Sequence, residues 1–291
     1  MQLNDRGLVS AARDLIKSVQ RNEIQVTAAA MAYTALFALV PLLIFLAALS
    51  GFISRWIGAD NTVETVMNFM FRHLPDNTVK ALEEPIDAIL RRQTGSLLSV
   101  GAVLAVWGSR SLINSGMRAI NKAYGVQEQR GFVKKNVISL GLTVGLGMMF
   151  VIGSGSVLLG SRWGDRVADK FGAGEQFADF WIQVRWPLIG ILLLIALIGY
   201  FRIAPATPTS IKLVFPGAAI TIVGWAVAIF GISFYFTVAG SWAAAYGVLG
   251  GLLAFVFWLY VMSLVFAFAA EFNALLYRRS IKTPLPPTAV P

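Results

Sequence analysis

Long stretches without a charged residue alternate with shorter polar segments along this 291-residue chain. A charge at the centre of a bilayer costs at least ~2.5 kcal/mol, so charge-free apolar stretches of about 20 residues predict membrane-spanning helices. One such helix, 28–53, lies between Glu23 and Arg55. Residues 213–270 carry no charge and are too many for one crossing, so we expect two helices joined by a turn at 240–242.

The whole pattern predicts an all-α, polytopic membrane protein with about six spans in one transmembrane domain, 27–279. The predicted spans are 28–53, 93–109, 137–159, 181–201, 213–238 and 246–270. The second and fourth are short for the thickness of a bilayer, so a broken or tilted helix is expected there.

Amphipathic segments flank and interrupt these spans. Residues 1–26 have apolar positions at helical spacing, which predicts a cytoplasmic helix that either lies on the membrane surface or caps the bundle. Residues 61–92 hold two helical patterns separated by Pro75, which predicts an outer helical hairpin. The Pro-rich residues 280–291 are expected to be a disordered cytoplasmic tail.

Composition agrees with lipid as the solvent, because 57% of the residues are hydrophobic and only 13% are charged. A soluble domain is roughly a quarter charged. Of the 24 Lys and Arg residues, 15 fall on the side of the termini and nine on the other, so the positive-inside rule places both termini in the cytoplasm of a bacterial inner membrane. The net charge of +9 is thus topological, and membrane lipids rather than nucleic acid are the expected partners. A homo-oligomer and unknown protein partners stay open.

Few kinds of catalytic chemistry fit this composition. The chain has no cysteine and one histidine, His73, which excludes disulfides, thiol nucleophiles and the usual Cys/His zinc sites. It has no P-loop, no His-Glu-x-x-His and no Gly-x-Ser-x-Gly motif. We therefore predict no catalytic residue, no metal and no cofactor, and a protein that is not an enzyme.

Small residues recur in two spans and are typical of helices that approach closely within a bundle or dimer. The predicted packing positions are Gly141, Gly145, Gly247, Gly250 and Gly251.

Polar groups and a proline at membrane depth are the candidates for a substrate pathway or gate, because unpaired polar groups in hydrocarbon are costly. These candidates are Tyr33, Pro41, Arg110, Asn114, Tyr246, Glu271 and Asn273. Pro41 either lines a cavity or only kinks the first span. For Glu271 a structural ion pair with Arg110 or Arg202 is favoured over a gating or proton-carrying role.

Several segments resemble the YihY/BrkB family, formerly labelled ribonuclease BN. Residues 28–41 resemble that family's opening Ala-x-Ala-Tyr…Ser-x-x-Pro motif, with Ala38 where a serine is usual, and 107–125, 215–218 and 241–275 also match. The resemblance implies a six-helix inner-membrane protein of unsettled function, for which export of lipid or another solute has been suggested. One histidine and no acidic cluster give no support to ribonuclease activity.

These observations lead to the hypothesis of a transporter-like protein that moves a lipid-derived or amphiphilic solute. Its cavity is expected between the first, third and sixth spans. The alternative is a non-transporting structural or interaction protein, in which the same polar groups only hold helices together.

Overall fold

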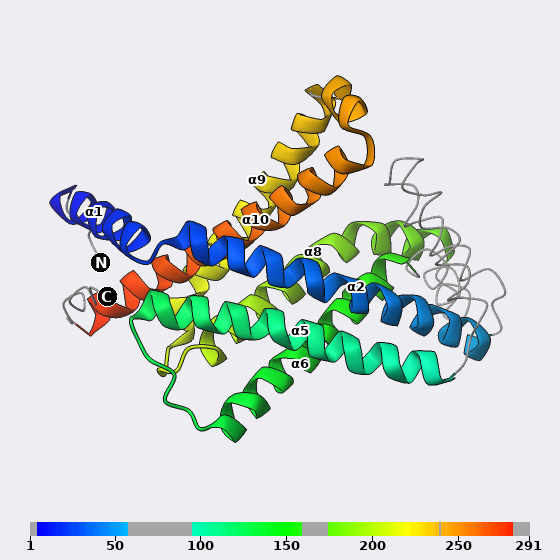
Figure 1. Cartoon of the computed structure of the whole chain (residues 1–291), viewed down its shortest axis with the longest axis horizontal. Coiled ribbons are helices and arrows are strands. Elements are labelled where there is room, and N and C mark those ends of the chain that lie inside the picture. Colours follow the sequence, from blue (N-terminus) through cyan, green and yellow to red (C-terminus); the bar gives the residue numbers. More distant parts are fainter. Residues whose placement is uncertain (1–4, 58–94, 159–173, 239, 282–291) are drawn as a thin grey trace.

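The computed structural model describes residues 5–57, 95–158, 174–238 and 240–281, and within these ranges the side chains of some helix ends, 240–251 among them, are left undescribed. The described residues are helices joined by short connections (Figure 1). The helices are α1 (Asp5–Arg21), α2 (Ile24–Ile57), α5 (Gly95–Tyr124), α6 (Phe132–Leu158), α8 (Gly174–Ile203), α9 (Ile211–Val238) and α10 (Gly240–Ser280). The predicted outer hairpin at 61–92 and the tail after Ile281 lie outside the described residues.

The prediction of an all-α polytopic membrane protein is confirmed. Three described stretches are long and apolar enough to cross a bilayer, and Ile24–Leu39 adds a shorter one. The three long stretches are Gln183–Ile203, Ile211–Phe234 and Leu252–Ser280. Large apolar side chains face outward, with Phe230 75% and Phe234 70% exposed, as expected where lipid replaces water. The count of six spans stays a prediction.

The two short predicted spans belong to long, continuous helices. α5 and α8 each have 30 residues, and α5 continues past the predicted end at residue 109 to Tyr124. It ends there because Gly125 adopts a left-handed φ of 67°, and Val126 then donates its N–H to the carbonyl of Asn121. Charged residues that were expected in a loop therefore lie on the last turns of α5.

Close helix contacts occur at Gly108 and Gly116, which are not among the predicted packing positions. A Cβ on Gly108 of α5 would lie 3.1 Å from the Cα of Ala38 in α2, and one on Gly116 would lie 2.3 Å from the Tyr200 hydroxyl in α8. In contrast, a Cβ on Gly141 or Gly145 has nothing within 4 Å among the described residues, so these two mediate no close contact there. Gly247, Gly250 and Gly251 lie in α10, but their surroundings are outside the description.

The helices meet at one end of the bundle, where α1 packs beside the end of α10 (Figure 1). α2 and α5 run side by side, and α9 with the first half of α10 forms a hairpin that leans away from them. Aromatic side chains pack where α8 crosses α10, and Phe201 stacks there on Phe266 at 4.9 Å between ring centroids.

Candidate functional site: an apolar cavity and its polar clamps

A cavity of about 570 Å³ lies among α2, α5, α6, α8, α9 and α10. Its wall is almost wholly apolar: Met31 comes from α2, Leu112 from α5, Met149 from α6, Leu193 from α8 and Phe266 from α10. The volume is within the ~300–1,000 Å³ range of small-molecule sites. Such a wall favours an alkyl chain over a polar solute, because it offers dispersion contacts and little hydrogen bonding.

Two of the few polar side chains in the wall form hydrogen bonds across helices. The Tyr200 hydroxyl donates to the carbonyl of Ile113 at 2.7 Å, and the Trp225 indole N–H donates to the carbonyl of Met262 at 2.9 Å. Both bonds join neighbouring helices, so these groups hold the wall together.

A buried polar cluster closes the end of the bundle where α1 meets α10. Glu271 accepts hydrogen bonds from the hydroxyl of Ser18 at 2.6 Å and from the amide of Asn22 at 2.5 Å. Arg278 lies 4.0 Å from Glu271, and it donates to Ser18 at 3.1 Å and to the carbonyl of Ala123 at 2.7 Å. Glu271 thus forms an ion pair with Arg278, about two helix turns away, and the prediction of Arg110 or Arg202 as its partner is wrong. The cluster ties α1, α5 and α10 together.

Asn273 binds the backbone on both sides of Pro216 in α9. Its side-chain oxygen accepts from the N–H of Gly217 at 2.9 Å, and its amide donates to the carbonyl of Val214 at 3.2 Å. A proline lacks the N–H of a helix ladder, so polar side chains are needed to pair backbone groups near it. Asn273 is fully buried in this contact and does not line the cavity.

The other predicted pathway residues are dispersed. Arg110 donates to Asn136 and so links α5 with α6. Asn114 has a buried side-chain oxygen with no hydrogen-bond partner among the described residues. Tyr33 is 65% exposed and packs against Phe37, so it lies outside the cavity wall.

Two further candidates are only partly placed. α2 runs through Pro41 without interruption, and Pro41 is not part of the cavity wall. Tyr246 lies in α10, and its side chain is outside the described residues.

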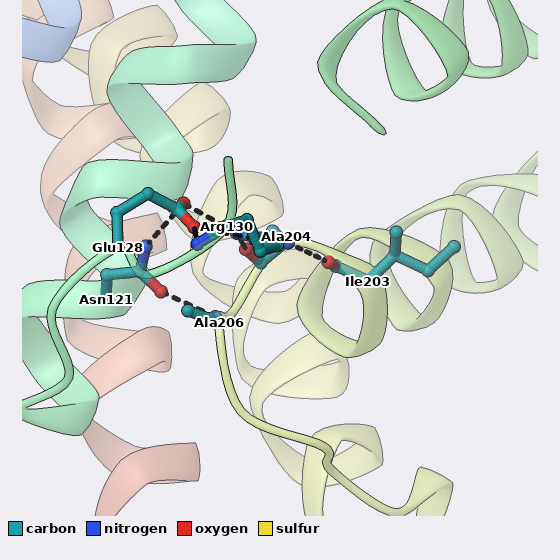
Figure 2. Close-up of polar contacts among 6 residues, drawn as sticks. All are labelled: Asn121, Glu128, Arg130, Ile203, Ala204 and Ala206. Atoms are coloured by element: carbon teal, nitrogen blue, oxygen red, sulfur yellow. Dashed lines mark hydrogen bonds and ion pairs between the residues drawn. The ribbon is translucent and has the colours of Figure 1, made fainter. Parts of the chain in front are cut away.

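A second polar clamp joins the connection between α5 and α6 to the end of α8 (Figure 2). Arg130 donates two hydrogen bonds of 2.7 Å to the carboxylate of Glu128. It also donates to the carbonyls of Ile203 at 3.2 Å and Ala204 at 2.8 Å. Asn121 donates to Glu128 and accepts from the backbone N–H of Ala206. Because Arg130 donates these bonds, the pKa of Glu128 lies below its usual range. A cation at the last carbonyls of α8 is also favoured by the helix dipole.

Residues missed by sequence reasoning contribute most of these clamps. Ser18 and Asn22 continue from Asp14 at four-residue spacing, so a polar stripe on the amphipathic N-terminal helix was a readable signal of a buried polar contact. Arg130 had no comparable signal for its contact with α8, because its partners there are backbone carbonyls more than 70 residues away.

The family model described as virulence factor BrkB matches residues 15–289. The chain belongs to the BrkB family. The predicted resemblance is thereby confirmed.

Curated relatives in this family cover nearly the whole chain. The ribonuclease-like protein YfkH of Bacillus subtilis is 28% identical over 271 residues, which are 93% of this chain and 96% of the relative. A UPF0761 membrane protein of Vibrio campbellii is 24% identical over 281 residues, 94% of this chain and 84% of the relative. No solved structure matches the chain.

The segments that carry the family resemblance meet in space. Ala38 from 28–41 contacts Gly108 from 107–125, and Gly217 from 215–218 binds Asn273 from 241–275. These motifs therefore have a physical role as helix contacts around the cavity. Among the described residues, no group of three or more His, Cys, Asp or Glu is placed to hold a metal ion.

Proposed function

We propose that this BrkB-family protein moves a lipid-derived or amphiphilic molecule across or within the bacterial inner membrane, with both termini in the cytoplasm, and that it is not an enzyme. The observation that supports this proposal most directly is the apolar cavity of about 570 Å³. It contacts α2, α6 and α10, the helices that contain the first, third and sixth predicted spans, together with α5, α8 and α9.

The structure of the wall supports movement of a chain rather than of a hydrated solute. A polar solute would leave its hydration shell without receiving hydrogen bonds in return, which is costly, whereas an alkyl chain loses nothing on leaving lipid. The polar clamps at Glu271 and at Glu128 lie at the ends of helices and hold the frame around the cavity.

Two glycines of α6 provide a matched test. Gly153 lines the cavity, whereas Gly147 does not, and a Cβ on either one meets nothing within 4 Å among the described residues. Gly153→Leu therefore adds a bulky side chain to the cavity wall without a described clash, and Gly147→Leu adds the same side chain elsewhere on the same helix.

The experiment follows leaflet exchange of NBD-labelled phosphatidylglycerol and phosphatidylethanolamine in reconstituted vesicles, with dithionite quenching as the readout. The native protein should accelerate exchange over protein-free vesicles. Gly153→Leu should remove most of that acceleration, and Gly147→Leu should retain it. Exchange no faster than in protein-free vesicles, by a folded protein, would refute the proposal and favour the structural role.

A further inference from the structure

Arg185 lies in the first half of α8, away from the end of the helix that meets the polar clamps. It is the third residue of the apolar stretch Gln183–Ile203, and about 27 Å of helix separates it from Ile203. That distance is close to the ~30 Å thickness of a hydrocarbon core. Arg185 therefore lies near the interface on the side away from Glu271 and Arg130.

The guanidinium of Arg185 lies beside a residue of the cavity wall. Its central carbon is 5.4 Å from the ring centroid of Trp186, and Trp186 both lines the cavity and is 60% exposed. The cation therefore lies next to a wall residue that is exposed at the protein surface.

One donor of this guanidinium is buried without a partner. The Nε atom of Arg185 has no hydrogen bond to any described residue. The Nε atom of Arg278 is likewise unpaired there, but the terminal nitrogens of Arg278 donate to Ala123 and Ser18. All three nitrogens of Arg130 donate to carboxylate or carbonyl oxygens. A buried, unpaired donor on a cation is costly, and an incoming anion relieves that cost. The planar fork of arginine matches two oxygens of a phosphate.

We infer that the molecule taken up by the cavity is an anionic lipid, whose phosphate headgroup binds Arg185 at the mouth while an acyl chain lies among Met149, Leu193 and Phe266. This inference rests on the proposed function and names its substrate class. A different reading treats Arg185 and Trp186 only as interfacial anchors, which are common at membrane surfaces. The anchor reading predicts no preference between headgroups.

The two readings are separated by native mass spectrometry of the full chain in a neutral detergent. Phosphatidylglycerol and phosphatidylcholine with identical chains compete for binding. The test uses the native protein, Arg185→Gln, Arg185→Lys and Gly153→Leu. The matched control is Arg202→Gln, which removes the same charge from an exposed position near the other end of α8.

The native protein should bind phosphatidylglycerol about tenfold more tightly than phosphatidylcholine, as expected for a charge-assisted contact. Arg185→Gln should abolish the preference, and Arg185→Lys should lower it several-fold because an ammonium cannot form the fork. Arg202→Gln should keep the preference for phosphatidylglycerol, and Gly153→Leu should weaken the binding of both lipids to the same extent. Excess glycerol 3-phosphate, which has the anion without the chain, should not displace the lipid.

Equal binding of the two lipids by the native protein would overturn the inference, as would a preference that survives Arg185→Gln. If Arg185→Gln does not fold, an unchanged preference in Arg185→Lys overturns it as well. The binding result can be told apart from the transport result. If the protein prefers phosphatidylglycerol but does not accelerate leaflet exchange, the proposed function is refuted and the anion site stands. If it accelerates exchange but shows no preference between the two lipids, the anion site is refuted and the proposed function stands.

Discussion

At the residue scale, Gly217 shows why particular small residues are needed in this bundle. A Cβ at this position would lie 2.3–2.4 Å from the side-chain atoms of Asn273. Asn273 is fixed in turn by its bonds to Gly217 and Val214, so it cannot move away without leaving buried backbone groups unpaired. The contact between α9 and α10 therefore requires a glycine at residue 217, because any larger side chain would overlap Asn273.

Alanine should have opposite effects at two glycines of α9. Gly217→Ala should destabilise the protein by ~1–3 kcal/mol, because it overpacks a buried polar contact. Gly231→Ala should leave stability unchanged or raise it slightly, since a Cβ there meets nothing within 4 Å among the described residues and alanine favours a helix. Thermal unfolding in detergent measures both, and equal shifts would contradict this account.

At the element scale, the polar stripe of α1 attaches the N-terminal helix to the rest of the molecule. Ser18 and Asn22 are buried against Glu271, while the neighbouring pair of Asp14 and Arg279 is partly exposed at 3.1 Å. Buried charge pairs are strongly destabilising when one partner is removed, whereas exposed pairs contribute little.

Glu271→Ala should loosen α1, because it leaves Arg278 buried without its carboxylate, at a cost of ~3–5 kcal/mol. Hydrogen exchange of the amides in α1 should then rise by orders of magnitude. Arg279→Gln, which breaks the exposed pair at the same interface, should change exchange little. Unchanged protection of α1 in Glu271→Ala would show that this clamp does not hold the helix.

The clamp of Glu128 and Arg130 should be sensitive to acid. Arg130 lowers the pKa of Glu128 below its usual value of 4.5, so the stabilisation is complete above that pH and is lost as the pH falls through the lowered pKa. The difference in Tm between the native protein and Glu128→Gln should be constant from pH 7 to about pH 5 and shrink below about pH 4.5. Glu23→Gln, at an exposed carboxylate, should show little difference at any pH. A gap between native and Glu128→Gln that widens in acid would reverse the sign and refute the assignment.

At the scale of the whole molecule, the sequence predicted the apolar helices, whose positions depend on the lipid solvent. It did not predict the cavity, which depends on how side chains of many helices pack together. Charge-free length located the apolar helices, because the cost of charge in hydrocarbon acts on each residue by itself. The residues of the cavity wall could not be predicted from the sequence, because they are ordinary apolar side chains spread over many helices. Tyr33 has the polarity of a pathway residue, yet Met31 and Ala35 of the same helix face the cavity.

The glycine spacing in α6 did not identify the close contacts of the described bundle, for a related reason. The spacing of glycines shows that another helix could approach closely, but it does not show which face of the helix has a neighbour. Gly141 and Gly145 have the spacing and no described neighbour, whereas Gly116 and Gly224 meet Tyr200 and Val265 directly. The amphipathic N-terminal segment was predicted as a helix, and the structure places its polar stripe against α10.

The central claim, that the cavity holds the chain of a lipid, is tested most directly by photolabelling. Vesicles containing phosphatidylglycerol with a diazirine in its acyl chain are irradiated, and labelled residues are identified by tandem mass spectrometry. We predict labels at the cavity methionines Met31, Met149 and Met262, lost in Gly153→Leu and kept in Gly147→Leu. Labels confined to outward-facing residues such as Phe230 and Phe234, with none in the cavity of the native protein, would contradict the account.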